Sequence, residues 1–232
     1  MLKAESLLAC MALAGGLLAA GPGHRAVGAQ APAAPQAAPP ARAPLETFDT
    51  KRPAKLDIVE ATGQYRVQEQ LVGISFPNDA VGTTRAITGT FVINPDGSIG
   101  SQSKLTVDLR TLGSDQEMRD NYVRSRTLET GKFPFLEFVP SRVEGLAVPL
   151  PSPPQAQALG FQLIGDMTLH GVTRPASWTV VAMLRGSTVA GRATTTVQFS
   201  DFNMTKPSVA VLLSAADKIQ LEVEFKCLRS VL

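Results

Sequence analysis

The sequence has few of the side chains that most often carry catalysis or bind metals. It contains two histidines and two cysteines among 232 residues. His24 and Cys10 lie in an N-terminal segment that we expect to be removed, which leaves His170 and Cys227. One histidine cannot form a His-Cys or His-His zinc cluster, and one cysteine cannot form an intramolecular disulfide. The G-x-S-x-G, P-loop and dinucleotide-binding fingerprints are also missing from the sequence.

Charge is sparse as well. Charged residues make up 18% of the chain, and the formal net charge is +2. Lysine and arginine form no long block, so the sequence has no basic footprint for nucleic acid. Beyond the N-terminal segment, no apolar run resembles a transmembrane helix.

The N-terminal segment has the features of a secretory signal. The apolar run "LLACMALAGGLL" follows Lys3, and Val27-Gly28-Ala29 forms an A-x-A-like cleavage site before Gln30. We therefore predict a signal peptide over residues 1–29 and export to the periplasm or the extracellular space. An uncleaved anchor, or a lipoprotein box ending at Cys10, are the alternatives.

A Pro/Ala-rich linker separates this segment from the globular part of the chain. Residues 30–56 include "APAAPQAAPPARAP", which cannot bury enough apolar surface to form a core. Residues 57–232 are long enough for one domain with a substantial core.

Most of this domain alternates between apolar and polar residues. In "KIQLEVEF", one face carries Ile219, Leu221, Val223 and Phe225. "KLTVDLR" and "FQLIGDMTL" show the same period of two, which is typical of antiparallel strands with one buried face. The pattern predicts an all-β fold with about eight antiparallel strands, closed into a barrel so that no sheet edge is left open. At that strand number the interior either fills with side chains or holds one ligand, and the sequence leaves both open.

One short helix is expected in "SDQEMRDNYVRSR". Ser114 and Glu117 have the spacing of a capping box. Asp115–Arg119 and Asp120–Arg124 have the spacing of helical ion pairs, so the charges have a structural explanation. The Pro-rich loop that follows Glu144 is either functional or a plain insertion.

The remaining candidates for chemistry have simple structural explanations. His170 lies in the tight turn "HGVTRP", where its ring is expected to make a turn or surface hydrogen bond. Asp115 and Asp120 point in different directions on a helix, and Cys227 is expected to be a semi-buried small hydrophobe. We therefore predict that the chain is not an enzyme, with an enzyme based on His170 as the weakest alternative.

Several separate blocks resemble the YceI-like family in order and spacing. The blocks are Gly89–Phe91, Val107–Leu112, Arg119-Asp120, Lys132–Phe138, Gly165–Pro175 and Asp201–Asn203, followed by "KIQLEVEF". The chain departs from the family in lacking a His-Ser pair in its first strands, in having Asn203 where glycine is usual, and in its longer Pro-rich loop.

The resemblance implies a lipocalin-like barrel that binds an isoprenoid or other long apolar lipid, without catalysis, metal or cofactor. A bound isoprenoid lipid or quinone would be a ligand, and the expected partners are an isoprenoid or fatty lipid, a membrane in transient contact and a second copy in a homodimer. The alternative is a stress-response or interaction module with a solid core and no lipid. The side chains expected to line the lumen are Phe91, Leu105, Val107, Leu136, Phe138, Leu163, Met167, Trp178, Val197 and Phe225.

Overall fold

Nine antiparallel strands and four short helical segments make up the part of the chain that the structure describes. The computed structural model describes residues 48–73, 75–152, 156–208 and 212–232. The strands are β1 (Ala54–Leu71), β2 (Asn78–Thr84), β3 (Ile87–Ile93), β4 (Lys104–Asp108), β5 (Phe135–Glu144), β6 (Gln157–Leu169), β7 (Val172–Arg185), β8 (Thr188–Gln198) and β9 (Leu212–Val231). The helical segments are η1 (Leu109–Thr111), α1 (Glu117–Tyr122), η2 (Val123–Thr127) and η3 (Ser200–Phe202).

The first and last strands close the sheet into a barrel. β9 pairs with β1 along its whole length, from Ala54 opposite Val231 to Leu71 opposite Leu212. β2 and β3 share the other edge of β1, because β3 pairs with residues 54–57 and β2 with residues 63–69. The nine strands therefore occupy about eight positions around the barrel, and the predicted antiparallel barrel is confirmed.

The barrel is stable because period-two alternation sends one set of side chains inward on every strand. On β7, Trp178, Val180, Ala182 and Leu184 are buried, while the residues between them are exposed. On β5, Leu136 and Phe138 are likewise buried, and Glu137, which lies between them in the sequence, is partly exposed. These side chains belong to one continuous hydrophobic cluster. Burying apolar surface in this way is the main driving force for folding.

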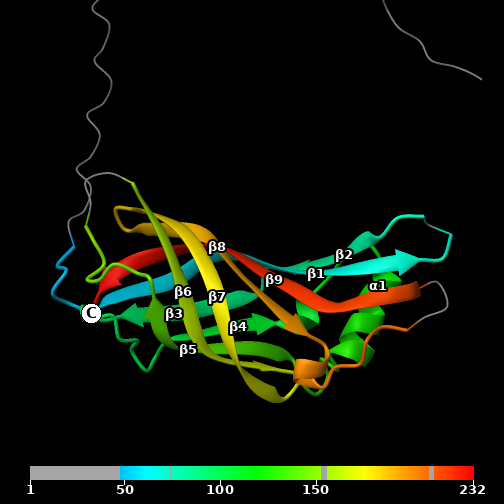
Figure 1. The fold of residues 1–232 in the computed structure, drawn as a ribbon. Helices are drawn as coiled ribbons and strands as arrows, with labels where there is room; N and C mark the ends of the chain where they lie inside the picture. Colours follow the sequence, from blue (N-terminus) through cyan, green and yellow to red (C-terminus); the bar gives the residue numbers. More distant parts are fainter. Residues whose placement is uncertain (1–47, 74, 153–155, 209–211) are drawn as a thin grey trace, which may run out of the picture. The chain divides into compact units, whose positions relative to one another are not determined.

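The helical segments lie at one end of the barrel. Figure 1 shows α1 at the end where β1 finishes and β9 starts, whereas the C-terminus lies at the opposite end. β1 begins at Ala54, within the last residues of the range predicted as linker, and the predicted signal peptide lies outside the described residues. None of the helices in the described ranges is long and apolar enough to span a membrane.

One glycine permits a close approach between two strands. The pairing of β5 with β6 shifts register between Pro140 and Arg142, as in a β-bulge. A Cβ atom on Gly165 would lie 2.2 Å from the carbonyl oxygen of Val139. Any larger residue at this position would therefore push the two strands apart.

The Pro-rich loop between β5 and β6 is pinned to the barrel at the end away from α1. Leu150 in this loop is buried, and Arg229 of β9 donates hydrogen bonds to the carbonyl oxygens of Leu150 (3.0 Å) and Pro151 (2.6 Å). The guanidinium of Arg229 also lies 4.6 Å from the ring centroid of Phe48. Arg229 is only 5% exposed, and this burial lowers the pKa of its guanidinium. The described part of the loop around Leu150 and Pro151 is thus anchored to this end of the barrel.

This arrangement predicts that Arg229→Met destabilises the protein by about 1–3 kcal/mol, because one buried and one partly buried carbonyl oxygen lose their donor while the length of the side chain is kept. Urea unfolding measures the change. The matched control is Arg192→Met, because Arg192 is exposed and contacts Glu222 and Glu224 on the outer surface. Its loss should cost less than about 1 kcal/mol. Equal losses for the two variants would contradict the role assigned to Arg229.

Candidate functional site

A cavity of about 790 Å³ occupies the α1 end of the barrel. Its walls come from the second half of β1, the first half of β9, the ends of β4 and β5 nearest α1, and the segment from η1 to η2. Most of the lining side chains are apolar, among them Val67, Leu109, Leu112, Leu169, Phe199 and Ile219. The lining also includes the exposed residues Asp115, Gln116 and Met118, so the cavity reaches the surface beside α1.

The floor of the cavity is Trp178 on β7. Its ring meets the ring of Phe138 edge to face, with 6.1 Å between the centroids. Phe138 does not line the cavity and is 1% exposed. Met167, opposite Phe138 on β6, and Leu184, further along β7 from the cavity, are fully buried. The lumen is therefore hollow at the α1 end and filled with side chains beyond Trp178.

The lumen-facing residues predicted from the sequence divide between these two regions. Those that line the cavity are Leu105, Val107, Leu136, Trp178 and Val197. Those that lie in the packed core or against it are Phe91, Phe138, Leu163, Met167 and Phe225. The alternation is the same along the whole barrel, so the sequence does not reveal the level at which the packed core begins. A ligand-binding role stays a prediction for all ten.

Several cavity residues were not predicted from the sequence. They include Tyr65, Leu112, Val123, Leu128 and Ala215. The alternation in "KIQLEVEF" did place Ile219, Leu221 and Val223 on an inward face, and all three line the cavity. The contributions from α1, η1 and η2 could not be found in this way, because no strand period runs through those segments.

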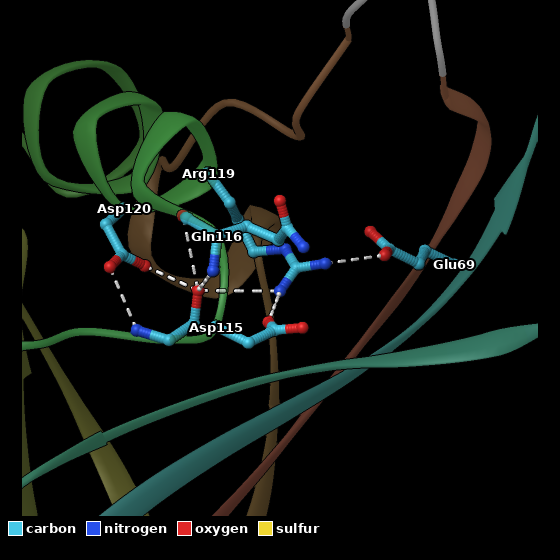
Figure 2. Close-up of polar contacts among 6 residues, drawn as sticks. Glu69, Asp115, Gln116, Arg119 and Asp120 are labelled. Carbon is cyan, nitrogen blue, oxygen red and sulfur yellow. Dashed lines mark hydrogen bonds and ion pairs between the residues drawn. The ribbon is translucent and has the colours of Figure 1, made fainter.

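An arginine at the mouth of the cavity ties α1 to the barrel. Arg119 donates to Asp115 at 2.7 Å and to Glu69 of β1 at 3.1 Å, as Figure 2 shows. The Arg119 and Glu69 side chains are 20% and 10% exposed, so this pair is largely shielded from solvent. The hydrogen bond from Arg119 holds the pKa of the Asp115 carboxyl below its ordinary value. The predicted Asp115–Arg119 pair is confirmed, and the arginine is already neutralised by two carboxylates.

The predicted capping box is wrong. Helix α1 starts at Glu117 with Gln116 as its N-cap, and the side chain of Gln116 makes no capping hydrogen bond. Ser114 instead donates its hydroxyl to Asp120 at 2.6 Å and its backbone N–H to the same carboxylate at 2.9 Å. Figure 2 labels Asp120, the residue whose carboxylate accepts both bonds. Through these two hydrogen bonds, Ser114 connects the loop before α1 to the first turn of the helix.

The predicted Asp120–Arg124 pair is also wrong. Arg124 donates to the carbonyl oxygen of Leu112 at 2.6 Å and to Asn121 at 3.0 Å. The carboxylate of Asp120 is occupied by Ser114, and tertiary contacts have replaced the helical pairing that the spacing suggested. Arg119, Arg124, Asp115 and Asp120 all have structural partners, as the sequence analysis expected in general terms.

Tyr65 presents a neutral polar group to the cavity. Its ring lies against Gly82, where a Cβ atom would come within 2.3 Å of Tyr65 Cε1. Burial raises the pKa of the Tyr65 hydroxyl to about 12, so the group stays protonated near neutral pH. Within the described ranges, this hydroxyl has no hydrogen-bond partner, which leaves it available to a ligand.

His170 and Cys227, the two side chains best suited to catalysis, lie outside the cavity lining. The ring nitrogens of His170 contact Glu129 Oε2 at 2.9 Å and the carbonyl oxygen of Phe202 at 3.1 Å. His170 and Gly171 both have positive φ, at 51° and 74°, so the histidine fixes a tight turn. Cys227 is buried, and burial raises the pKa of its thiol to about 12, which suppresses the nucleophilic thiolate. Among the described residues, no group of three or more His, Cys, Asp or Glu side chains could hold a metal ion.

Curated proteins similar to this chain come from Pseudomonas putida. A UPF0312 protein of strain W619 is 30% identical over 135 residues, which cover 54% of this chain and 64% of that protein. A UPF0312 protein of strain GB-1 is 29% identical over an alignment of the same extent. The chain therefore spans less than two thirds of the length of these curated relatives.

Solved structures share the fold. A polyisoprenoid binding domain from Saccharophagus degradans has a TM-score of 0.57 at 13% identity, and the match covers 76% of this chain and 98% of that one. A YCEI protein of Campylobacter jejuni has a TM-score of 0.50 at 14% identity, with 70% of this chain and 90% of that one covered. At these identities the likeness shows a common barrel architecture.

A family model gives the assignment. The model of the YceI-like domain matches residues 57–227, which include every strand except the first residues of β1 and the last residues of β9. The match agrees with the family that the sequence blocks resembled. The chain belongs to the YceI-like family.

Proposed function

We propose that the chain is an exported, non-enzymatic carrier that holds an isoprenoid or another long apolar lipid in the cavity of its barrel. The observation that carries this proposal is the apolar cavity of about 790 Å³ with a mouth beside α1. Ligand pockets typically measure roughly 300–1,000 Å³ and are lined mainly by apolar groups. The polyisoprenoid binding domain of Saccharophagus degradans, which shares the fold, supports the choice of ligand class.

The energetics favour a flexible hydrocarbon chain as the occupant. Each methylene group moved from water into the cavity contributes about 0.8 kcal/mol. About ten buried methylene groups would thus provide roughly 8 kcal/mol, which must exceed the costs of immobilising the lipid. The barrel wall is held by its hydrogen-bond ladder, so the cavity is formed before the lipid arrives and little ordering of the protein is needed.

The mouth is surrounded by exposed apolar residues that suit contact with a membrane. Phe76 (79% exposed) lies in the turn between β1 and β2, and Leu213 (65% exposed) lies at the start of β9. Leu71 and Leu212, which line the cavity, pair with each other at this same end. Met118 on α1 is exposed and is itself a lining residue, and Figure 1 shows α1 at this end of the barrel. A lipid leaving a bilayer at this rim would enter the cavity without crossing water.

Export is part of the proposal and concerns residues outside the described ranges. We expect material from the native host to begin near Gln30, because the apolar run and the Val27-Gly28-Ala29 site have the features of a cleaved signal. N-terminal sequencing of the soluble protein tests this. Soluble protein that retains Met1 would overturn the cleavage, and a lipid-modified Cys10 would favour the lipoprotein alternative.

The carrier function predicts that filling the cavity removes the lipid while the fold survives. Ala215 of β9 lines the cavity, so Ala215→Phe places a phenyl ring in space that is otherwise open. The matched control is Gln220→Phe, because Gln220 lies on the same strand and is exposed. We expect lipid extraction and mass spectrometry to find a bound lipid in the parent protein and the control, and at most about one tenth as much in Ala215→Phe.

Two results would contradict this prediction. Equal lipid content in Ala215→Phe and the control would place the lipid outside the cavity. If the parent protein carries no lipid and takes up no added farnesol, the carrier function fails and the interaction module without a lipid ligand becomes the better explanation.

The rim predicts a separate effect on the rate of lipid transfer. Replacing Phe76 and Leu213 with serine removes two apolar groups that would insert into the bilayer, so extraction of farnesol from phosphatidylcholine vesicles should slow by about tenfold or more. Val181→Ser is the control, because Val181 is 62% exposed on β7. Affinity for detergent-solubilised farnesol should not change in either variant. Equal extraction rates would rule out the rim as the membrane contact.

A further inference from the structure

One hydroxyl group in the cavity wall is accessible and has no partner in the described part of the protein. Tyr65 lies on β1 between Gly63 and Val67, which also line the cavity, and these three positions share one face of the strand. None of the described residues forms a hydrogen bond with the Tyr65 hydroxyl. Its oxygen is not among the side-chain atoms that are both unpaired and cut off from open space. The hydroxyl can therefore meet a molecule that occupies the cavity.

The ring of Tyr65 is held in place by the strand beside it. Gly82 lies directly opposite Tyr65 in the pairing of β1 with β2, and a Cβ atom on Gly82 would come within 2.3 Å of Tyr65 Cε1. The ring therefore lies against the backbone of β2. Next to Gly82, Thr83 exchanges two backbone hydrogen bonds with Gly113, at 2.8 and 3.0 Å. This pairing places the Tyr65 ring near the loop that leads to α1, at the end of the barrel where the cavity reaches the surface.

The charges near the Tyr65 hydroxyl are mainly negative. Burial is the main cause of its raised pKa of about 12, one nearby guanidinium lowers this pKa, and three nearby carboxylates raise it. The guanidinium belongs to Arg119, and the carboxylates belong to Glu69, Asp115 and Asp120. Arg119 is the only lysine or arginine among the described residues that line the cavity, and it is bonded to Asp115 and Glu69. An anionic head group here would meet like charges and no free cation, which is costly in a partly buried site.

The chemistry of a phenol limits what can satisfy this hydroxyl. A protonated tyrosine both donates and accepts hydrogen bonds. A hydrocarbon does neither, so a wholly apolar ligand leaves the hydroxyl unpaired. The oxygen of an alcohol or a carbonyl group supplies a partner, carries no charge and loses little hydration on entering an apolar cavity. The surroundings of Tyr65 therefore favour an uncharged oxygen.

We propose that the cavity selects lipids with an uncharged oxygen head group, an alcohol or a carbonyl, and that the Tyr65 hydroxyl forms a hydrogen bond with this oxygen. This inference rests on the lipid-carrier function and deepens it, because it assigns the head group and the residue that recognises it. The head group lies near the loop that leads to α1, and the hydrocarbon tail extends toward Trp178. Tyr65 is thus a specificity-determining residue.

The test compares four twelve-carbon probes: 1-dodecanol, n-dodecane, dodecanoate and dodecylammonium. Trp178 is the only tryptophan of the chain and lines the cavity, so its fluorescence near neutral pH reports how far each probe fills the cavity. We expect 1-dodecanol to bind about tenfold or more tightly than either ion, because each ion has to give up its hydration on entering the cavity.

Tyr65→Phe supplies the second readout, because it keeps the ring and removes the hydroxyl. The affinity for 1-dodecanol should fall about fivefold or more, which is the contribution of one hydrogen bond, while the affinity for n-dodecane stays within about twofold. Tyr122→Phe is the matched control, since it makes the same change at the only other tyrosine, whose hydroxyl contacts the backbone N–H of Ser208 at 3.5 Å. It should lower the affinity for 1-dodecanol by less than about twofold.

A signal from Tyr65 itself tests the hydrogen bond in the parent protein, even if Tyr65→Phe does not fold. Labelling with tyrosine that carries ¹³C at Cζ gives one signal for each of the two tyrosines, and Tyr122→Phe assigns them. The Cζ chemical shift responds to hydrogen bonding of the hydroxyl. We therefore expect 1-dodecanol to move the Tyr65 signal further than n-dodecane does.

The outcomes separate this inference from the proposed function. If 1-dodecanol and n-dodecane both bind but move the Tyr65 signal equally, or if Tyr65→Phe keeps its full affinity for 1-dodecanol, the role of Tyr65 is overturned while the carrier function stands. An ion that binds as tightly as 1-dodecanol overturns the assignment of an uncharged head group. If none of the four probes binds, the carrier function itself is contradicted and this proposal falls with it.

Discussion

The structure depends on the pairing of its first strand with its last. β1 and β9 run side by side over their whole lengths, which joins the two ends of the domain and leaves no open edge between them. Once the sheet is closed, every inward side chain faces the same interior, and the number of strands sets how wide that interior is. Non-local pairing of this kind also makes the core cooperative, because each strand contributes to a single hydrophobic cluster.

The two ends of the barrel differ in how their interior is filled. At one end, the buried guanidinium of Arg229 holds the Pro-rich loop through backbone carbonyl oxygens, and the interior is filled by side chains such as Leu184. At the other end, Arg119 links α1 to β1 through Glu69 and leaves a hollow beneath the helix. The open end also carries the exposed apolar residues Phe76 and Leu213. The cavity among the described residues therefore reaches the surface at the α1 end.

The polar groups of the molecule are divided in a way that suits binding more than reaction. His170 is held in a turn by Glu129, and the thiol of Cys227 is buried and protonated. The hydroxyl of Tyr65, which lines the cavity, is protonated and therefore neutral. Neutral donors in an apolar wall can orient a ligand at low cost, because they need not be stripped of the strong hydration that a charge carries.

The alternation along the strands was sufficient to predict the antiparallel barrel, the inward faces and the burial of Leu136 and Phe138, because strand periodicity is a local property of the chain. The partner of Ser114, the anchoring of the Pro-rich loop and the height of the cavity were decided only by tertiary structure. Ser114 bonds to Asp120 and forms no capping box with Glu117, because the loop before α1 brings Ser114 next to the Asp120 carboxylate. Arg229 and Leu150, which bond to each other, are 79 residues apart in the sequence. An inward position is hollow or filled according to what the facing strands and α1 place opposite it, and this depends on contacts between residues far apart in the sequence.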